Sequence, residues 1–374
     1  PLADEWLCED GDYANEIEHG LLGWSNELVL HCVELKNIHP TRDLAGLAAQ
    51  CQAEVRRANA RLADFNARLM PTAMHPWMDP RRETCLWPHR NAIIYQTYDR
   101  LFDCRAHGWA NLQSMQVNVP FADDREFARV HAAVRLALPI LPALAASSPI
   151  AEGAITRWLD FRMEAYRTNA ESIPSIGGAV IPETVASRAE YEARILAPMY
   201  RDIALLDPEG VLRHEWLNSR GAIPRFDRSA IEIRVIDMQE CPAADCAVAA
   251  AVIALVKSLH DAMPREPVPT DALAAILAAC VRDGERAVIE DARYLDVLGF
   301  PEPNCRAGDL WRHLIEALAP LYGVEALRTI LDHGPLARRI LNAVGPKGEH
   351  ARMEAVYREL CDCLDEGRMF LGLD

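Results

Sequence analysis

The stretch that decides the fold is Ala230-Ile231-Glu232-Ile233-Arg234-Val235-Ile236-Asp237. Its apolar and polar residues alternate, so that Ile231, Ile233 and Val235 fall on one face and Glu232 and Arg234 on the other. A period of two is typical of a strand that is buried on one side, because successive side chains of a strand point to opposite faces. We therefore predict a half-buried strand here.

Two further segments show the same period. In residues 114–121 the odd positions are apolar, and the opposite face carries Gln116 and Asn118. Residues 25–36 are a third candidate strand. Glu27 and Glu34 have opposite parity in it, so a bulge or a strand end must separate them if both face one site.

The rest of the chain is dominated by helical spacing of its apolar residues. We expect helices over residues 43–69, 92–107, 124–146, 188–205 and 244–262, and an almost wholly helical last hundred residues. One-sided strands suit an antiparallel sheet with helices on a single face. We predict an α+β body over residues 1–262 and a helical C-terminal region over 263–374, packed on the same domain, with the proline-containing residues 263–269 as the linker.

Composition restricts the function. The chain has 374 residues and a formal net charge of −16, which argues against nonspecific binding to nucleic acid or anionic membranes. The apolar runs are shorter than the ~20 residues that cross a bilayer, and no leader-like segment opens the chain. The 11 cysteines contain no CxxC pair. We expect a cytoplasmic protein with reduced cysteines; a homo-oligomer is compatible with these features.

The polar side of the predicted sheet carries the groups that bind metal and phosphate. No GxxxxGK[ST] or GxGxxG loop occurs, so a nucleotide would be held through metal ions instead of a glycine cradle. Glu27, Glu34 and Glu232 offer the hard oxygen ligands that magnesium prefers, and Arg234 could bind a neighbouring phosphate oxygen. The alternative is a solvated sheet surface on which Glu232 and Arg234 neutralise each other.

Several motifs together resemble one family. They are Met74-His75-Pro76-Trp77, the run from Ala146 to Gly153 that contains Ser147-Ser148-Pro149 and is followed by Arg162, and Asn218-Ser219-Arg220 leading into Ala230–Asp237. In order and spacing they resemble glutamate-cysteine ligase family 2, the carboxylate-amine ligases. The resemblance covers roughly residues 25–259.

The resemblance implies a glutamine-synthetase-like fold, in which an antiparallel sheet curves into a funnel with helices outside. It also implies a reaction in which ATP phosphorylates a carboxylate, typically of glutamate, and an amine attacks the acyl phosphate to form an amide. The implied magnesium ligands are Glu27, Glu34, Glu232 and Gln116. The implied nucleotide and catalytic residues are Arg220, Arg234, Glu232 and Asn118, and the implied substrate-binding residues are Arg162, His75 and Trp77.

Two departures from the family pattern leave a second function open. Relatives begin with a Gly-x-Glu-x-Glu strand, whereas Glu16-Ile17-Glu18 lacks the glycine and lies close to Glu27; either an upstream segment is missing or the chain begins at Pro1. The family's strand also has a histidine metal ligand where this chain has the neutral Gln116. The alternative function is therefore a catalytically silent relative that binds a metabolite, nucleotide or partner protein.

Overall fold

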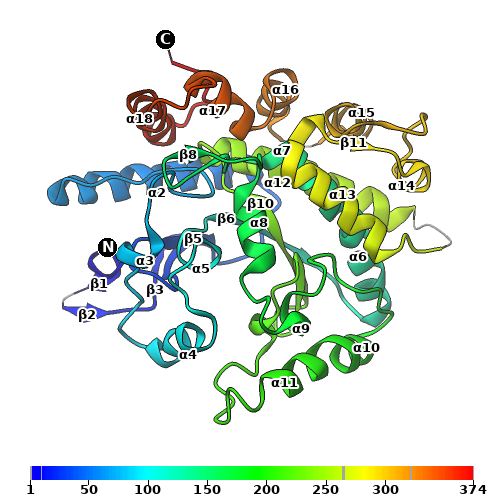
Figure 1. The fold of residues 1–374 in the computed structure, drawn as a ribbon, viewed down its shortest axis with the longest axis horizontal. Helices are drawn as coiled ribbons and strands as arrows, with labels where there is room; N and C mark the ends of the chain where they lie inside the picture. The colour runs from blue at the N-terminus through cyan, green and yellow to red at the C-terminus, as the bar shows by residue number, and fades with distance from the viewer. Residues whose placement is uncertain (1, 10, 263–265, 321, 374) are drawn as a thin grey trace.

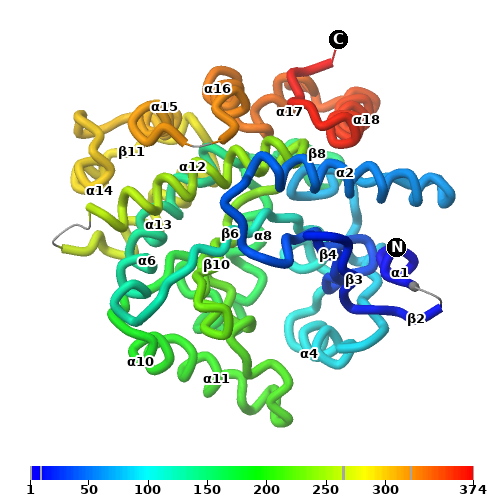
Figure 2. Tube along the Cα trace, turned by 180° about the vertical axis from the view of Figure 1, so that it is seen from behind, coloured from blue at the N-terminus to red at the C-terminus, as the bar shows by residue number. Residues whose placement is uncertain are grey.

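The structure is a computed structural model that describes residues 2–9, 11–262, 266–320 and 322–373. The first strands lie to one side, the central strands lie in the middle, and the last helices form a row along one edge (Figure 1). The reverse view shows the same arrangement, with the N-terminal segment well away from that row (Figure 2).

The N-terminal sheet consists of β3 (Glu16–His19), β4 (Leu22–Asn26) and β5 (Val33–Asn37), in the order β3-β4-β5. A two-residue turn joins β3 to β4. It contains Gly20, whose φ of 65° lies in the left-handed region that glycine adopts without strain. On the apolar face of the sheet, Trp24 packs in one cluster with Trp6 and Trp87. The opposite face is free to carry polar groups.

Two expectations about this region are wrong. Residues 25–36 are not one strand, because β4 ends at Asn26 and β5 begins only at Val33. The strand end required between Glu27 and Glu34 is therefore present. An acidic strand does precede Glu27, since Glu16-Ile17-Glu18 lies in β3 and pairs with β4. Antiparallel neighbours need only a tight turn, so the short spacing does not exclude the pairing.

The central sheet has the order β6-β10-β9 and consists of β6 (Ser114–Pro120), β10 (Ala230–Asp237) and β9 (Ala222–Arg225). The two strands predicted from the clearest alternation are confirmed. β9 was not predicted, and it contains Pro224. Proline lacks the N–H that a ladder requires, and its place on an edge strand is where sheets tolerate it.

A β-bulge interrupts β10. The pairing with β6 is in register up to Ile233 and resumes at Ile236, but Arg234 and Val235 between them face a single residue of β6, Gln116. An extra residue bends its strand and changes where its side chains point. The predicted alternation therefore holds only up to the bulge.

Helices cover the apolar face of the central sheet. They are α6 (Asp124–Ala137), the 3-10 turn η2 (Leu138–Ile140), α7 (Leu141–Ala145) and α12 (Pro242–Asp261). Ile231 and Ile233 of β10 are buried in the same hydrophobic cluster as Phe127, Leu141 and Val252 of these helices. The other face of the sheet remains available for polar residues, as the one-sided pattern predicts.

The remaining strands form small two-stranded antiparallel sheets. They are β1 (Cys8–Glu9) with β2 (Asp12–Tyr13), β7 (Ile150–Ala151) with β8 (Ala154–Ile155), and β11 (Val288–Ile289) with β12 (Cys305–Arg306). The protein thus belongs to the α+β class, as predicted. In the described part of the chain, strand pairing gives separate small sheets and does not join them into one continuous curved sheet.

The other helices include those of the expected ranges, together with short helices in the first two thirds of the chain that were not predicted. Before the central strand β10 these are α1 (Ala3–Trp6), α2 (Leu44–Leu62), η1 (Ala63–Phe65), α3 (Pro80–Glu83), α4 (Ala92–Phe102), α5 (His107–Ala110), α8 (Phe161–Thr168), α9 (Pro174–Gly177), α10 (Arg188–Tyr191), η3 (Glu192–Leu196), α11 (Ala197–Ile203) and η4 (Glu215–Leu217). After α12 they are α13 (Thr270–Asp283), η5 (Gly284–Arg286), α14 (Ala292–Val297), α15 (Ala307–Leu318), α16 (Val324–His333), α17 (Leu336–Val344) and α18 (His350–Glu366).

The C-terminal helices share their apolar contacts with the rest of the chain. Leu273 of α13 and Leu310 of α15 belong to the hydrophobic cluster that contains β10. Ile150 of β7 packs in a second cluster with Ile340 of α17 and Tyr357 of α18. Of the predicted linker, residues 263–265 lie outside the described residues, and residues 266–269 are irregular.

Although uninterrupted apolar runs fall short of a membrane span, two helical stretches are long and apolar enough to span a membrane by length and composition alone, which differs from the expectation. One runs from Asp124 to Ala145 and the other is α12, Pro242–Asp261. Both are mostly buried in the protein, where they pack on the central sheet. Their apolar surfaces therefore already have a partner within the chain.

Candidate active site

Three polar side chains form a row across the open face of the N-terminal sheet. Glu16, Ser25 and Glu34 stand directly opposite one another on β3, β4 and β5. The Ser25 hydroxyl donates to Glu34 Oε2 over 2.8 Å. Lys36 Nζ lies 3.0 Å from Glu16 Oε2 and 3.6 Å from Glu34 Oε2, so one ammonium group offsets the charge of both acids.

Glu16 was not among the residues predicted for the site, although the sequence around it has the pattern of a strand. The order acid, apolar, acid in Glu16-Ile17-Glu18 has the strand period of two. Ser25 and Lys36 were also missed as members of the site. Neither residue type marks a metal or phosphate site by itself, and only the cross-strand register brings them to the acids.

Glu27 follows the last residue of β4 and lies close to this row. Its side chain has contact with solvent, but the surrounding protein desolvates the carboxyl group. This desolvation and the charge of Glu34 raise the pKa of Glu27 to about 7, while Arg234 and Lys36 act in the opposite direction. Groups from both three-stranded sheets therefore influence one carboxylate.

Glu232 lies on the open side of the central sheet and is 4% exposed. Arginines approach both of its oxygens. Arg225 Nη1 donates to Oε2 over 2.9 Å, and Arg234 Nε lies 3.3 Å from Oε1. The ion pair between Glu232 and Arg234, which was the simpler alternative for this strand, is thus present.

Arg234 lies within electrostatic range of groups near both sheets. Burial by itself lowers its pKa, but Tyr166, Glu232, Tyr98 and Glu27 outweigh that effect and raise the pKa above the ordinary value. Arg234 therefore keeps its positive charge where β10 approaches Glu27. The structure brings together Glu27, Glu34, Glu232 and Arg234, four residues that the sequence indicated for one site.

The two amides of β6 lie on the predicted side of the central sheet. Both Gln116 and Asn118 are exposed. Asn118 stands opposite Glu232, and Gln116 stands opposite the bulge at Arg234. Their amide oxygens border the acids and the arginine, and an amide oxygen can ligate magnesium without contributing charge.

Arg220 is held by an acid of the protein itself. Its Nε and Nη2 donate to the two carboxylate oxygens of Glu183 over 2.6 and 2.7 Å, and its Nη1 donates to Asn218 Oδ1 over 3.1 Å. The side chain is 3% exposed. A phosphate group could bind this guanidinium only by displacing Glu183.

Arg162 is likewise engaged. Its Nε donates to Asp237 Oδ1 in a buried ion pair, and its Nη1 donates to the backbone carbonyl of Arg234 over 3.3 Å. Asp237 also accepts hydrogen bonds from Ser147 and Ser148, the serines of the Ser-Ser-Pro motif. Arg162 Nη2 is buried without a hydrogen-bond partner among the described residues, so it is the nitrogen left for a substrate carboxylate while Asp237 holds Nε.

His75 and Trp77 lie beside the C-terminal helices. The two rings meet edge to face at 5.4 Å, and Trp77 makes a similar contact with Tyr357 of α18 at 5.7 Å. The backbone of His75 is held by Asn111, whose Oδ1 accepts from the His75 N–H over 2.8 Å. These contacts are with loop and helix residues, not with the acids of the two sheets.

Of the three acids predicted as magnesium ligands, two are placed where they could bind a divalent cation. Within the residues that the structure describes, no group of three or more His, Cys, Asp or Glu side chains is arranged as ready metal ligands. Glu27 and Glu34 offer hard oxygens, and a bound cation would relieve the repulsion that helps to raise the pKa of Glu27. Glu232 would first have to release an arginine. The pair Glu27 and Glu34 therefore fits magnesium better than Glu232 does.

Fold and site together define an α+β protein in which acids and an arginine from two antiparallel sheets meet. The chain belongs to glutamate-cysteine ligase family 2, whose model matches residues 11–361. The resemblance recognised from the motifs is confirmed, and it extends further in both directions than the motifs do. Membership in this family identifies the chain as ligase-like.

Similar proteins cover most of the chain. A protein of Archaeoglobus fulgidus named "Uncharacterized protein" is 32% identical over 99% of this chain and 95% of its own length. Two proteins from Bradyrhizobium strains are 29% and 28% identical, over 79% and 81% of this chain and 68% and 70% of their own lengths. Both carry the name "Putative glutamate--cysteine ligase 2".

Proposed function

We propose that the protein is an ATP- and magnesium-dependent carboxylate-amine ligase. It activates the carboxylate of glutamate or a similar amino acid as an acyl phosphate, which an amine then attacks to form an amide. One observation carries the proposal: the carboxyl group of Glu27, next to β4, lies within electrostatic range of Glu34 on β5 and of Arg234 on β10. Family membership supports the same reaction class.

The charges of the site suit phosphoryl transfer. Catalysis of such a transfer depends mainly on positioning and on neutralising charge. Glu27 and Glu34 would hold magnesium with help from Gln116, and the bound ion would offset charge on the phosphoryl oxygens. Arg234, kept protonated by its neighbours, would bind an oxygen of the transferred group.

Other residues take supporting roles in this proposal. Asn118 and Glu232 lie beside Arg234 and would orient the nucleotide and the arginine. Arg220 would contact phosphate only after Glu183 moves away. The substrate amino acid would approach on the side of Arg162, His75 and Trp77.

We further propose that the two three-stranded sheets together line a glutamine-synthetase-like funnel; the electrostatic influence of Arg234 of β10 on Glu27, next to β4, supports this arrangement. The partners would be small amino-acid and amine substrates, without nucleic acid or membrane, in a cytoplasmic protein. A homo-oligomer is compatible with this function.

An ADP-release assay tests the proposal. Glutamate is supplied with Mg-ATP and a panel of amines, cysteine among them, and amide formation is followed by mass spectrometry. Arg234→Gln should reduce amide-coupled ADP release by at least ~100-fold, the usual effect of removing a group that stabilises transition-state charge. Arg228→Gln, in the exposed turn before β10, is the matched control. Equal activity of both variants would remove Arg234 from the mechanism.

A catalytically silent nucleotide-binding relative is the second candidate. Two observations favour it: Gln116 is neutral, and within the described residues no three acidic or histidine ligands are ready for metal. Thermal unfolding with Mg-ATP separates the two functions, because a ligand at 100 times its Kd stabilises the native state by about 2.7 kcal/mol. Stabilisation without turnover on any amine would favour the silent relative. Turnover would exclude it.

A further inference from the structure

A cavity of about 600 Å³ lies among the C-terminal helices, between η5, α16, α17, the start of α18 and the segment around Leu371. It is separate from the residues of the candidate active site described above. Four arginines line it: Arg286, Arg338, Arg339 and Arg352. A volume of this order is typical of pockets that bind small molecules.

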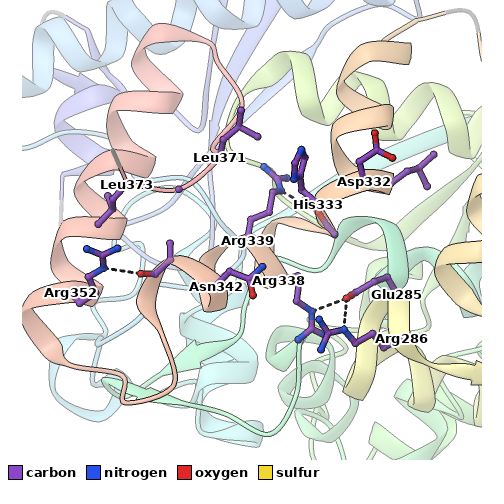
Figure 3. A pocket seen from close by; sticks show the side chains of 14 residues that line it. Glu285, Arg286, Asp332, His333, Arg338, Arg339, Asn342, Arg352, Leu371 and Leu373 are labelled. Atoms are coloured by element: carbon purple, nitrogen blue, oxygen red, sulfur yellow. Dashed lines mark hydrogen bonds and ion pairs between the residues drawn. The ribbon is translucent and has the colours of Figure 1, made fainter.

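The lining carries an excess of positive charge in a chain whose net charge is −16. Glu285 accepts from Arg338 over 2.7 Å and lies 3.2 Å from Arg286, so a single carboxylate serves two guanidinium groups. Figure 3 shows both arginines turned to this one acid, with Arg352 on the α18 side of the pocket. Asp332, the other acid of the lining, pairs with Arg312 of α15.

Arg352 contributes donors that the protein does not use. Its Nε donates to the backbone carbonyl of Ala343 over 2.8 Å, which fixes the plane of the guanidinium at the edge of the pocket. No hydrogen bond of its two terminal nitrogens is found within the described residues. A fixed guanidinium with free N–H groups is well suited to bind a carboxylate or phosphate.

Arg339 provides a second and independent observation. The residue is only 4% exposed, and its Nη1 is bound by Glu240 and by the carbonyl of Phe370. Its Nη2 is buried without a hydrogen-bond partner in the described part of the chain. A buried donor without a partner is costly, so a ligand oxygen that accepted from Nη2 would gain more than one bound at the surface.

We propose that this cavity, the tail arginine pocket, binds a small molecule that carries an oxyanion group, a phosphate or a carboxylate, held by Arg339 and Arg352 with Arg286 adding positive charge to the lining. The apolar side chains of Leu371 and Leu373 complete the lining, so they would contact the non-ionic part of the ligand. The site would serve as a second ligand site, separate from the one in which Arg234 acts.

Isothermal titration of the full chain tests this proposal, with inorganic pyrophosphate as probe in magnesium-free buffer. We expect binding to the parent protein, and a Kd raised at least about tenfold in the double variant Arg286→Ala/Arg352→Ala. Both arginines are exposed, so their loss should leave the protein folded. The control is Arg328→Ala, which removes one positive charge from an exposed position of α16 outside the pocket and should leave the Kd unchanged.

Two further measurements make the outcome decisive. Pyrophosphate binding should persist in Arg234→Gln, because Arg234 belongs to the candidate active site. If Arg234→Gln lost binding and the double variant kept it, the proposal would be overturned. No binding to the parent protein of either pyrophosphate or citrate at millimolar concentration would also overturn it. Tighter binding of pyrophosphate than of citrate would identify a phosphate ligand, and the reverse a carboxylate ligand.

Discussion

The guanidinium of Arg162 donates from Nη1 to the backbone carbonyl of Arg234, 3.3 Å away, at the bulge of β10. Arg162 is in turn fixed by the buried Asp237, so an ion pair at the end of the strand supports the backbone from which Arg234 projects. The Ser-Ser-Pro motif therefore has a structural role, because its two serines donate hydrogen bonds to Asp237.

Arg162→Met should lower the free energy of unfolding by about 3–5 kcal/mol, because it leaves the buried carboxylate of Asp237 without its counterion. Urea denaturation followed by circular dichroism measures the change. Arg167→Met, on the exposed side of the same helix, is the control and should cost less than about 1 kcal/mol. If both variants were equally stable, Asp237 would have to be satisfied without Arg162.

Gly221→Ala tests how tightly the bulge is packed. A Cβ at this position would lie 2.6 Å from Val235 Cγ1 and 3.3 Å from the carbonyl oxygen of Val180, so the packing around it must shift. We expect a loss of about 1–3 kcal/mol in stability, typical of overpacking. Gly177→Ala, where a Cβ meets nothing within 4 Å, should be nearly neutral in the same thermal-unfolding experiment.

Glu34→Gln should weaken the magnesium dependence of activity. The substitution keeps the hydrogen bond with Ser25 feasible but removes one of the two carboxylates that we propose as magnesium ligands. The magnesium concentration for half-maximal ADP release should rise at least ~10-fold, as it does even for residues that only support metal ligands. Glu209→Gln, an exposed acid outside the site, is the control. An unchanged magnesium requirement would exclude Glu34 as a ligand.

Asp245 predicts a pH dependence of stability. Burial raises its pKa from 3.8 to about 7 in the folded protein, so between these values the folded state binds the proton and the unfolded state does not. This carboxyl group therefore lowers stability as pH rises, by up to about 1.4 kcal/mol per pH unit. In urea titrations, the free energy of unfolding of Asp245→Asn should rise relative to that of the parent as the pH increases from about 4 to 7. The exposed control Asp296→Asn should show no such rise. A pH-independent difference would contradict the raised pKa.

Alternation of apolar and polar residues predicted the two main strands of the central sheet, because one buried face leaves a clear period in the sequence. It also placed Glu232, Asn118 and Gln116 on one side of that sheet. The sequence analysis grouped Glu27 with Arg234 as candidate site residues, but it could not show how near they lie, because Glu27 follows β4, Arg234 lies on β10 and no local spacing relates the two.

Other features could not be predicted from local pattern. The bulge in β10 depends on its register with β6, and the partners of Arg220 and Arg162 are acids 37 and 75 residues away in the chain. The acids of β3 were not expected to join the site, because they lie close to Glu27 in the sequence and a long connection between the two strands was assumed. The structure joins β3 to β4 by a tight hairpin turn instead. Trp77 packs on α18, a helix that carried no recognisable motif.

The ion pair between Arg339 and Glu240 can form only late in synthesis of the chain. Glu240 lies three residues after β10, while Arg339 and the Phe370 carbonyl that it also binds are made roughly a hundred residues later. Until the ribosome has released them, the end of β10 carries an acid without its counterion. The last helices therefore neutralise an acid that was synthesised long before them, and a chain that stopped before Arg339 would leave Glu240 without this counterion.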